Sequence, residues 1–471
     1  MSETLTGLKH DSHGWWLEEA GRVAPRPALQ GELVADVVVI GGGYTGLWAA
    51  WCLLEREPDA RIVVLEADVC GHGPSGRNGG FLNSLWYAMA NLRERFGTSA
   101  ALAVARAAEE SITAIGRWCE EHEVDAWYRR AGHLVVSTAA AFDAVSEPAV
   151  SACAEVGQPD KYVFLERAEM HERCASPLFR RGAFMPDAGT VHPARLALGL
   201  RARLIERGAI IHERSPVLRV EGGKSGVVIE TPGARVRAGA AILALNASSA
   251  GVGPLRRRLT VASSHIVLTE PVPEVLEEIG WTGGESISDA RAYLHYFRTT
   301  RDGRIVFGWA GGRMAYGARV GRRIEVDHDV TAQAHRDLVR FFPAVAGRRI
   351  THAWGGPIDV SPTHLPVFGT LPGARVHYGF GYTGNGVGPS HLGGRILAAL
   401  ALDRREDLTR LALVEPPAVK VPPEPFRYIG GQLIRSAFLR KERAEEHGQT
   451  VDPLTAFVAD VPRRIGVHVG R

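Results

Sequence analysis

Three glycines between two apolar runs constrain this chain more than any other feature of its sequence. Residues 35–55, ADVVVIGGGYTGLWAAWCLLE, begin with a β-branched run, turn at Gly41, Gly43 and Gly46, and continue with the apolar spacing of a helix. Residues 61–67, RIVVLEA, have the composition of a second buried strand. The pattern therefore predicts a βαβ unit with a glycine-rich turn at the start of its helix.

Such a turn is typical of a dinucleotide-binding site. Gly41 permits a tight turn, Gly43 lets the backbone approach a pyrophosphate, and Gly46 lets the helix pack closely on the strand. The helix N-terminus adds free N–H groups and a partial positive charge for the phosphates. Glu66 ends the second strand, where a carboxylate can accept hydrogen bonds from the ribose hydroxyls.

Two other segments repeat the G-x-G-x-x-G spacing, CGHGPSGRNGG at 70–80 and GFGYTGNGVG at 379–388. No helix with suitable packing directly follows the first, and one helix with a proline-rich tail follows the second instead of another βαβ unit. A second nucleotide site is therefore not predicted. The segment at 379–388 instead predicts a second helix N-terminus, whose N–H groups can stabilise an anion.

These segments together resemble a known family of enzymes. GGGYTGLWAAW, VVLEAD, GPSGRNGG and GYTGNGVGPSHLGGR resemble the amine and amino-acid oxidase superfamily of FAD enzymes, over roughly residues 30–400. That superfamily includes D-amino-acid oxidase, glycine oxidase, sarcosine oxidase and γ-glutamylputrescine oxidase. The SGRNGG form is most similar to γ-glutamylputrescine oxidase and to aminophosphonate oxidoreductases. The motifs are specific to the superfamily and not to a substrate.

The resemblance implies a mixed α/β fold with two discontinuous domains and a tail. A Rossmann-like FAD-binding domain is expected over residues 30–91, 175–262 and 350–410. An antiparallel-sheet substrate domain is expected over residues 92–174 and 263–349. Residues 411–471 are expected to form a proline-rich linker and an amphipathic basic helix. That helix is expected to pack on the body or on a sister subunit, with an anionic membrane surface as the alternative.

The resemblance also implies how FAD is held. The first loop takes the pyrophosphate and ribose, the loop at 70–80 lies against the ribityl chain and flavin ring, and the loop at 381–387 lies at the pyrimidine edge. Related enzymes that attach FAD covalently place a histidine where Asn78 stands, so non-covalent FAD is expected. The expected FAD-binding residues are Gly41, Gly43, Tyr44, Thr45, Gly46, Glu66, Ala67, Ser75, Gly76, Arg77, Asn78, Gly79, Gly80, Val217, Asn246, Ala247, Gly381, Thr383, Gly384, Asn385, Gly386 and Val387.

The substrate site is expected at a predicted hairpin, residues 290–312, in which an Asp-Gly turn joins two alternating runs. In the first run, alternation places Tyr293, His295 and Phe297 on one face and Leu294, Tyr296 and Arg298 on the other. Which face lines the pocket stays open, as does whether Arg298 holds a substrate anion or is a solvated strand-end residue. The candidate catalytic or substrate-contacting residues are Tyr293, His295, Tyr296, Arg298, Trp309 and Tyr382.

The chemistry that the resemblance implies is oxidation of a C–N bond. A small primary or secondary amine, an amino acid or an aminophosphonate would lose its α-hydrogen as hydride to flavin N5, and the imine would hydrolyse. Molecular oxygen is the expected acceptor. The alternatives are a dehydrogenase that passes electrons to a quinone or carrier protein, and a flavoprotein subunit without turnover. No motif identifies the amine.

A scarcity of lysine bears on the reaction with oxygen. Sarcosine oxidase places a lysine over the flavin, but no lysine of this chain falls in a motif that approaches the ring; the five are Lys9, Lys161, Lys224, Lys420 and Lys441. The cation would then be His295, Arg77, Arg298 or the protonated product. If it is His295, reoxidation should slow as the pH rises from about 6 to 8.

Composition limits the remaining classes. The 471 residues are 45% hydrophobic and 23% charged, as in a globular protein with a large core and two domains. The net charge of +3 and the lack of basic stretches interleaved with aromatics argue against nucleic acid. Five scattered cysteines predict free thiols in a reducing compartment and no metal site. A polar N-terminal segment and the lack of a long apolar run predict a cytoplasmic protein.

Overall fold

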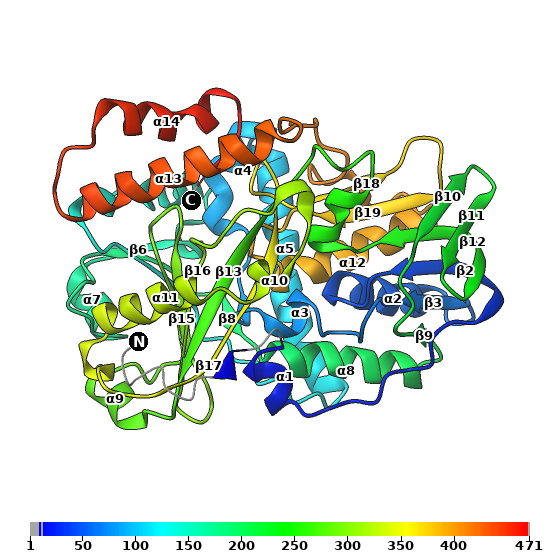
Figure 1. Ribbon diagram of the computed structural model, residues 1–471, viewed down its shortest axis with the longest axis horizontal. Helices are drawn as coiled ribbons and strands as arrows, with labels where there is room; N and C mark the ends of the chain where they lie inside the picture. The colour runs from blue at the N-terminus through cyan, green and yellow to red at the C-terminus, as the bar shows by residue number, and fades with distance from the viewer. Residues whose placement is uncertain (1–8, 11–12, 470–471) are drawn as a thin grey trace.

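Two large sheets organise the chain in the computed structural model, which describes residues 9–10 and 13–469 (Figure 1). Residues 1–8 and 11–12 of the polar N-terminal segment lie outside this description. One sheet has eight strands and the other nine, with helices packed around both. The predicted mixed α/β class is confirmed.

The eight-stranded sheet has a parallel centre. Its order is β10-β11-β12-β2-β3-β9, with β19 paired to β12 and β18 paired to β19. β2, β3, β9, β12 and β19 are parallel, as expected around the predicted βαβ unit. The strands are β2 (Gly31–Ile40), β3 (Ile62–Leu65), β9 (Ile210–His212), β10 (Arg219–Gly223), β11 (Gly226–Thr231), β12 (Ala234–Leu243), β18 (Val367–Thr370) and β19 (Val376–Phe380).

The apolar run of β2 is buried on both of its faces, which is why it reads as continuous rather than alternating. Val37 and Val39 face a core shared with the helices α2 (Tyr44–Arg56), α5 (Thr98–Glu121), α8 (Pro193–Glu206) and α12 (Val387–Ala401). Val38 and Ile40 face a second core beneath the hairpin of β11 and β12. The packing of this sheet and these helices sets the positions of the glycine-rich N-termini of α2 and α12.

The nine-stranded sheet has the order β1-β17-β13-β16-β15-β14-β5-β7-β6. It is antiparallel except where β1 pairs with β17 and β14 pairs with β5. The predicted hairpin is confirmed as β15 and β16. The strands are β1 (Lys9–His10), β5 (His133–Val136), β6 (Val163–Leu165), β7 (Gly182–Met185), β13 (Thr260–Thr269), β14 (Ser286–Asp289), β15 (His295–Thr299), β16 (Ile305–Trp309) and β17 (Ile350–Val360).

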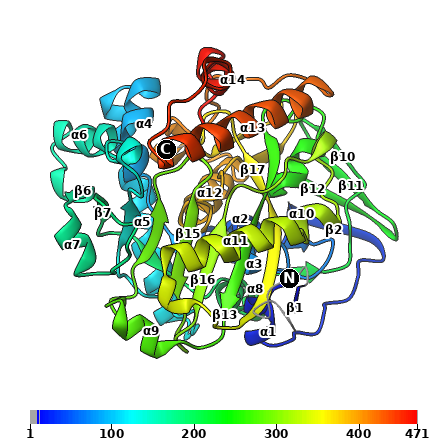
Figure 2. The same ribbon diagram turned by 60° about the vertical axis from the view of Figure 1, so that its left-hand side comes forward.

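This sheet draws on more of the chain than the ranges expected for a substrate domain. β7 and β17 belong to it, although they fall inside the ranges 175–262 and 350–410 that were expected to bind FAD. One face of the sheet is covered by α11 (His328–Phe341), which lies across β13 and β16 in Figure 2. Phe297, Phe307 and Phe341 form part of the core between them.

The tail forms two helices rather than the single predicted one. α13 (Phe426–Glu446) and α14 (Pro453–Arg464) pack on one another and lie over the nine-stranded sheet, in orange and red in Figure 1. Among the residues that the structure describes, no helix is both long enough and apolar enough to cross a bilayer.

Shorter elements connect these layers. The helices are α1 (Trp15–Glu19), α3 (Pro74–Arg77), α4 (Met89–Phe96), α6 (Glu147–Glu155), α7 (Arg167–His171), α9 (Pro273–Glu278) and α10 (Arg322–Glu325). Short 3₁₀ helices are η2 (Trp86–Ala88), η3 (Ala140–Phe142), η4 (Pro159–Lys161), η5 (Asn246–Gly251), η6 (Tyr316–Ala318), η7 (Pro343–Val345) and η8 (Asp407–Arg410). A two-stranded sheet pairs β4 (Phe81–Leu82) with β8 (Gly189–Thr190).

Candidate active site

A cavity of about 1120 Å³ is lined by residues of both large sheets and of the loops between them. The three glycine-rich segments at 41–46, 70–80 and 381–387 all contribute to its wall. Residues separated by more than 300 positions in the sequence thus meet at one site, as the FAD expectation requires.

The first loop leaves no room for side chains. Gly41 has a φ of +108°, and a Cβ there would lie 2.4 Å from the carbonyl oxygen of Ala244. A Cβ at Gly46 would lie 1.9 Å from the carbonyl oxygen of Gly41. The turn can therefore be this tight only with glycine, and it brings the start of α2 to the cavity.

Glu66 lies at the end of β3 and lines the cavity. Its Oε2 accepts a hydrogen bond from the Gly42 N–H at 2.6 Å, and its Oε1 accepts one from the Asp68 N–H at 2.9 Å. Burial raises the pKa of this carboxyl, although the backbone donors oppose the shift. The carboxyl is held beside the first loop, where a ribose would lie.

The second loop is closed by the side chain of Asn78. Its Nδ2 donates to the carbonyl oxygens of Pro74 and Ser75, and its Oδ1 accepts from the Gly80 N–H at 2.7 Å. Ser75 reaches the first loop, where its Oγ accepts from the Tyr44 N–H at 2.9 Å. The two loops are therefore joined directly at the cavity wall.

Arg77 fixes the same loop to the opposite sheet. Its guanidinium pairs with Glu325 at 3.2 Å, and its carbonyl oxygen accepts from the indole N–H of Trp354 on β17 at 2.7 Å. Arg77 is a cation of the cavity wall, but a carboxylate already neutralises it.

The third loop is anchored from two sides. Asp359 Oδ2 accepts a hydrogen bond from the Gly381 N–H at 2.5 Å, and burial raises the pKa of Asp359 to about 7. Tyr382 Oη accepts from Thr45 Oγ1 at 2.8 Å, which joins the third loop to the first. The start of α12 is thus held against the cavity next to the start of α2.

Most of the expected FAD-binding residues line the cavity, and the rest support its wall from behind. Those that line it are Gly41, Gly43, Tyr44, Thr45, Glu66, Ala67, Ser75, Arg77, Asn78, Gly79, Val217, Asn246, Thr383, Gly384, Asn385, Gly386 and Val387. Those behind the wall are Gly46, Gly76, Gly80, Ala247 and Gly381. The close glycine turns, the buried acid at the end of β3 and the two helix starts fit FAD.

The hairpin turns one face to the cavity. Leu294, Tyr296 and Tyr382 line it, and the Tyr296 hydroxyl lies 2.7 Å from Ser264 Oγ, also on the wall. Burial raises the pKa of Tyr296 to about 12, so its hydroxyl stays protonated near neutral pH. Tyr293 and Trp309 lie away from the cavity, joined by a hydrogen bond from the Trp309 indole to the Tyr293 carbonyl oxygen at 3.1 Å.

Arg298 does not face the cavity, although it lies on the same side of β15 as Tyr296. Its guanidinium donates to the carbonyl oxygens of Gly80 at 3.2 Å and Val191 at 2.6 Å. Burial lowers the pKa of Arg298 to about 9. The structure thus places Arg298 behind the second loop, where it supports the backbone instead of a substrate anion.

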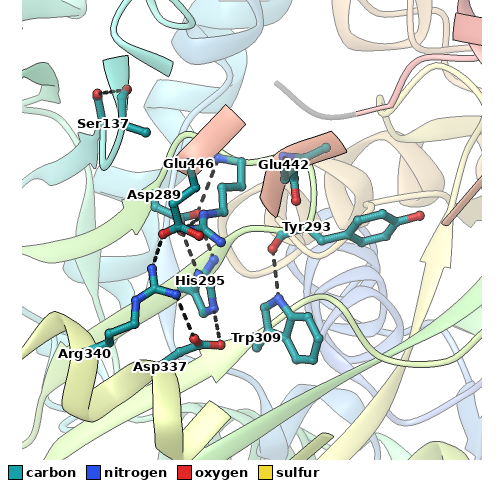
Figure 3. Close-up of polar contacts among 12 residues, drawn as sticks. Ser137, Asp289, Tyr293, His295, Trp309, Asp337, Arg340, Glu442 and Glu446 are labelled. Carbon is teal, nitrogen blue, oxygen red and sulfur yellow. Dashed lines mark hydrogen bonds and ion pairs between the residues drawn. The ribbon is translucent and has the colours of Figure 1, made fainter. Parts of the chain in front are cut away.

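His295 lies on the far face of the sheet, inside the ionic network of Figure 3. Its Nδ1 is 2.7 Å from Asp289 Oδ2 and its Nε2 is 3.1 Å from Asp337 Oδ2. Burial opposes a charge on the ring, but the two carboxylates outweigh it and raise the pKa of His295. The network continues through Arg291 and Arg340 to Glu446 of α13.

Sequence reasoning missed several polar residues of the wall, among them Ser264, Ser288 and Asn83. Asn83 is buried, and among the described residues its Oδ1 has no hydrogen-bond partner. Ser288 Oγ lies 2.8 Å from Nε2 of His133, which stands behind the wall. The alternation of ESISD at 285–289 predicts a strand, but only its pairing with β15 and β5 shows which side chains reach the cavity.

One potential metal-ligand group lies outside the cavity. The side-chain ligand atoms of His13, Asp68 and His72 lie within 4.8 Å of one another near the surface. The sequence analysis predicts no metal site. This group could not be found from sequence spacing, because His13 meets Asp68 and His72 only when the N-terminal segment packs against the loop after β3.

Comparisons with known proteins agree with this geometry. A family model described as FAD dependent oxidoreductase (DAO) matches residues 36–400. The chain is 31% identical over 428 residues to a probable oxidoreductase OrdL of Rhizobium meliloti, covering 88% of this chain and 91% of that protein. It is 29% identical to the gamma-glutamylputrescine oxidoreductase of Escherichia coli, covering 92% and 96%. The crystal structure of glycine oxidase from Geobacillus kaustophilus superposes with a TM-score of 0.66 at 21% identity, covering 82% of this chain and 100% of that one.

Proposed function

Because the chain belongs to the DAO family of FAD-dependent oxidoreductases, we propose that it oxidises the C–N bond of an amine with no carboxylate on the reacting carbon. FAD is the cofactor. When bound, it accepts a hydride from the α-carbon, and the imine product hydrolyses. The E. coli relative at 29% identity is a gamma-glutamylputrescine oxidoreductase, and an amine substrate of this kind is consistent with that name.

The observation that carries the proposal is the charge of the cavity wall. Its side chains that ionise readily are Glu66, Arg77, Arg219 and Asp359. Arg77 is paired with Glu325, and Arg219 is on β10 of the eight-stranded sheet, paired with Glu221 at 2.6 Å. A carboxylate or phosphonate bound in a water-poor site needs a cation with free hydrogen-bond donors. Among the described residues, the wall formed by the nine-stranded sheet offers none.

That same wall suits an ammonium group. It presents the hydroxyls of Ser264, Ser288 and Tyr296, which can accept hydrogen bonds from N–H donors. The ring of Tyr296 lies edge to face with Phe81 at 5.8 Å between centroids, and together they give the site an apolar side. These residues bind and orient the amine and exclude water, while the three loops hold the cofactor.

Matched substrate pairs test the proposal. The FAD-loaded protein is mixed without oxygen with cadaverine or lysine, and with tyramine or tyrosine, and flavin bleaching is followed. We expect the amine of at least one pair to bleach the flavin at least ~100-fold faster than its carboxylated partner, because an unpaired buried charge costs several kcal/mol. Equal or faster bleaching by the amino acids would contradict this choice of substrate.

A second candidate concerns the electron acceptor. Among the described residues, no lysine lines the cavity, and His295 lies behind the sheet. With Arg77 neutralised by Glu325, the described wall offers little to stabilise superoxide, which favours a dehydrogenase that passes electrons to a quinone or carrier protein over an oxidase. Stopped-flow mixing of the reduced protein with oxygen, and separately with a quinone, decides between the two. Fast reoxidation by oxygen would restore the oxidase, and a rate that slows from about pH 6 to 8 would require a histidine near the flavin.

A further inference from the structure

We propose that Ser288 and His133 form a proton relay that takes the ammonium proton of the substrate. The proposal rests on the proposed amine oxidation, which needs the amine in its neutral form. It assigns a role to a buried histidine that neither the cofactor loops nor the hairpin accounts for.

The relay is built by the parallel pairing of β14 and β5. Ser286 and Ser288 are two residues apart and so share one face of β14. The ring of His133 lies against both, with Nδ1 2.9 Å from Ser286 Oγ and Nε2 2.8 Å from Ser288 Oγ. Ser288 lines the cavity, whereas His133 is 2% exposed and stands one layer behind it.

The hydrogen bonds give the relay a direction. Ser286 Oγ lies 3.5 Å from the carbonyl oxygen of Gly132, to which it can donate. A Ser286 hydroxyl that donates there accepts from the N–H of His133 Nδ1. The ring lone pair of His133 is then on Nε2, where it accepts from the Ser288 hydroxyl.

The proton transfer balances without a further reactant. The substrate ammonium gives a proton to Ser288 Oγ while the Ser288 hydroxyl proton passes to His133 Nε2. One N–H and one O–H bond break, one O–H and one N–H bond form, and no electrons are exchanged in this step. The amine keeps the lone pair that hydride loss requires, and His133 carries the positive charge.

The strands that pack against His133 place apolar side chains around its ring. Phe81 of β4 lies 5.7 Å away between ring centroids, and Met185 lies opposite on β7. β4 and β7 carry no ionisable side chain, and His133 is the one ionisable residue of β5. Charged residues at the two ends of β14 have other partners: Glu285 pairs with Arg173 at 3.4 Å, and Asp289 pairs with His295 on the far face.

The pH dependence of flavin reduction tests the relay. At pH 7 an alkylamine is almost entirely protonated, since its pKa lies near that of lysine, about 10.4. We expect Ser288→Ala and His133→Gln to slow reduction about 100-fold at pH 7. The deficit should shrink strongly near pH 10, where roughly 30% of the amine is already neutral in solution and needs no relay. Ser288→Thr, which keeps a hydroxyl, should restore most of the rate at pH 7.

Ser264→Ala is the matched control, because Ser264 is another wall hydroxyl but is bonded to Tyr296 instead of histidine. It should keep the wild-type shape of the pH profile. A deficit in Ser288→Ala that is the same at pH 7 and pH 10, in a protein with full FAD content, would show a merely structural role and overturn the relay.

A binding titration separates this proposal from the proposed function. tert-Butylamine has no α-hydrogen and cannot be oxidised, so its effect on the flavin spectrum reports binding alone. The relay predicts that Ser288→Ala lowers the affinity for tert-butylamine several-fold at pH 7. At pH 10 the affinities of Ser288→Ala and the wild type should be similar. Failure of the wild type to oxidise any amine would overturn the proposed function, while an unchanged affinity ratio would overturn the relay.

Discussion

Glu66 shows how one side chain can serve both the loop and the cofactor. Each of its oxygens already accepts a backbone N–H and retains a lone pair for a ribose hydroxyl. We therefore expect Glu66→Ala to weaken FAD binding by about 2–3 kcal/mol, the range for hydrogen bonds to charged groups. Titration of the apoprotein with FAD measures this. Glu57→Ala, which removes a partly exposed carboxylate paired with Arg404, should leave the affinity unchanged. A Glu66→Ala protein that holds FAD as tightly as the wild type would exclude the ribose contact.

Asn78 and Cys70 together predict non-covalent FAD. The Asn78 side chain is used up in closing the second loop. The Cys70 thiol is buried beneath Gly42, and burial with the nearby Glu213 and Glu66 carboxylates raises its pKa well above the usual value, so it does not form a thiolate for attachment. Acid or heat precipitation should leave all of the flavin in the supernatant. Flavin that remains with the pellet would reveal a covalent bond.

At the scale of elements, the tail helix α13 holds the hairpin next to the cavity. Glu442 Oε1 accepts from the Ala292 N–H at 2.6 Å, and Arg435 donates to the carbonyl oxygens of Gly311 and Gly312. Ala292 and Gly311 flank Leu294 and Ala310, which line the cavity. The tail thus positions the rim of the cavity next to the hairpin.

The stability that the buried Glu442 contributes should fall as the pH rises, because burial disfavours its charged form. Burial raises the pKa of Glu442 to about 7, from 4.5 in the unfolded chain. Between these values the folded state keeps a proton that the unfolded state has lost, so the contribution to stability is full below pH 4.5 and is lost as the pH rises through 7. The loss is at most about 3 kcal/mol. Urea unfolding between pH 5 and 8 measures how the free energy of unfolding changes with pH. This change should be smaller for Glu442→Gln than for the wild type. Glu445→Gln, which alters an ion pair on the same helix, should keep the wild-type pH dependence. Parallel slopes for all three proteins would exclude Glu442 as the source.

Features set within one short segment could be predicted from the sequence, whereas features set by the packing of distant segments could not. The cofactor loops are predictable because Gly41, Gly46 and Glu66 act through spacing within one βαβ unit. The hairpin at β15 and β16 is likewise local, but alternation alone could not say that Tyr296 faces the cavity and His295 the far side. That choice depends on the packing of α11 against one face of the sheet.

The contact between Ser288 and His133 could not be predicted from the sequence, because it also depends on the packing of distant segments. Ser288 and His133 are 155 positions apart, and they meet only because β14 pairs with β5 in one register. A shift of that register by one residue would turn Ser288 away from the cavity. The second tail helix, α14, was missed because its 12 residues include Pro462, which argues against a helix at the sequence level.

At the scale of the whole molecule, the cavity couples both sheets to the cofactor. Residues of the eight-stranded sheet, the nine-stranded sheet and all three loops line one space. FAD at about a thousandfold excess over its dissociation constant should therefore stabilise the fold by about 4 kcal/mol. Calorimetry should show a single transition that moves to higher temperature as FAD is added. Two transitions, of which only one responds to FAD, would show that the sheets unfold independently.

The bond between Thr45 and Tyr382 has a consequence for how the protein is made. It spans 337 positions of the chain. A ribosome adds roughly 5–20 residues per second, so roughly 20–70 s separate the appearance of the first loop from that of the third. During that interval the nascent polypeptide exposes a βαβ unit that lacks α12 as a neighbour of α2. The complete FAD site can form only after the third loop has left the ribosome, and the face of α2 that packs on α12 stays uncovered until then.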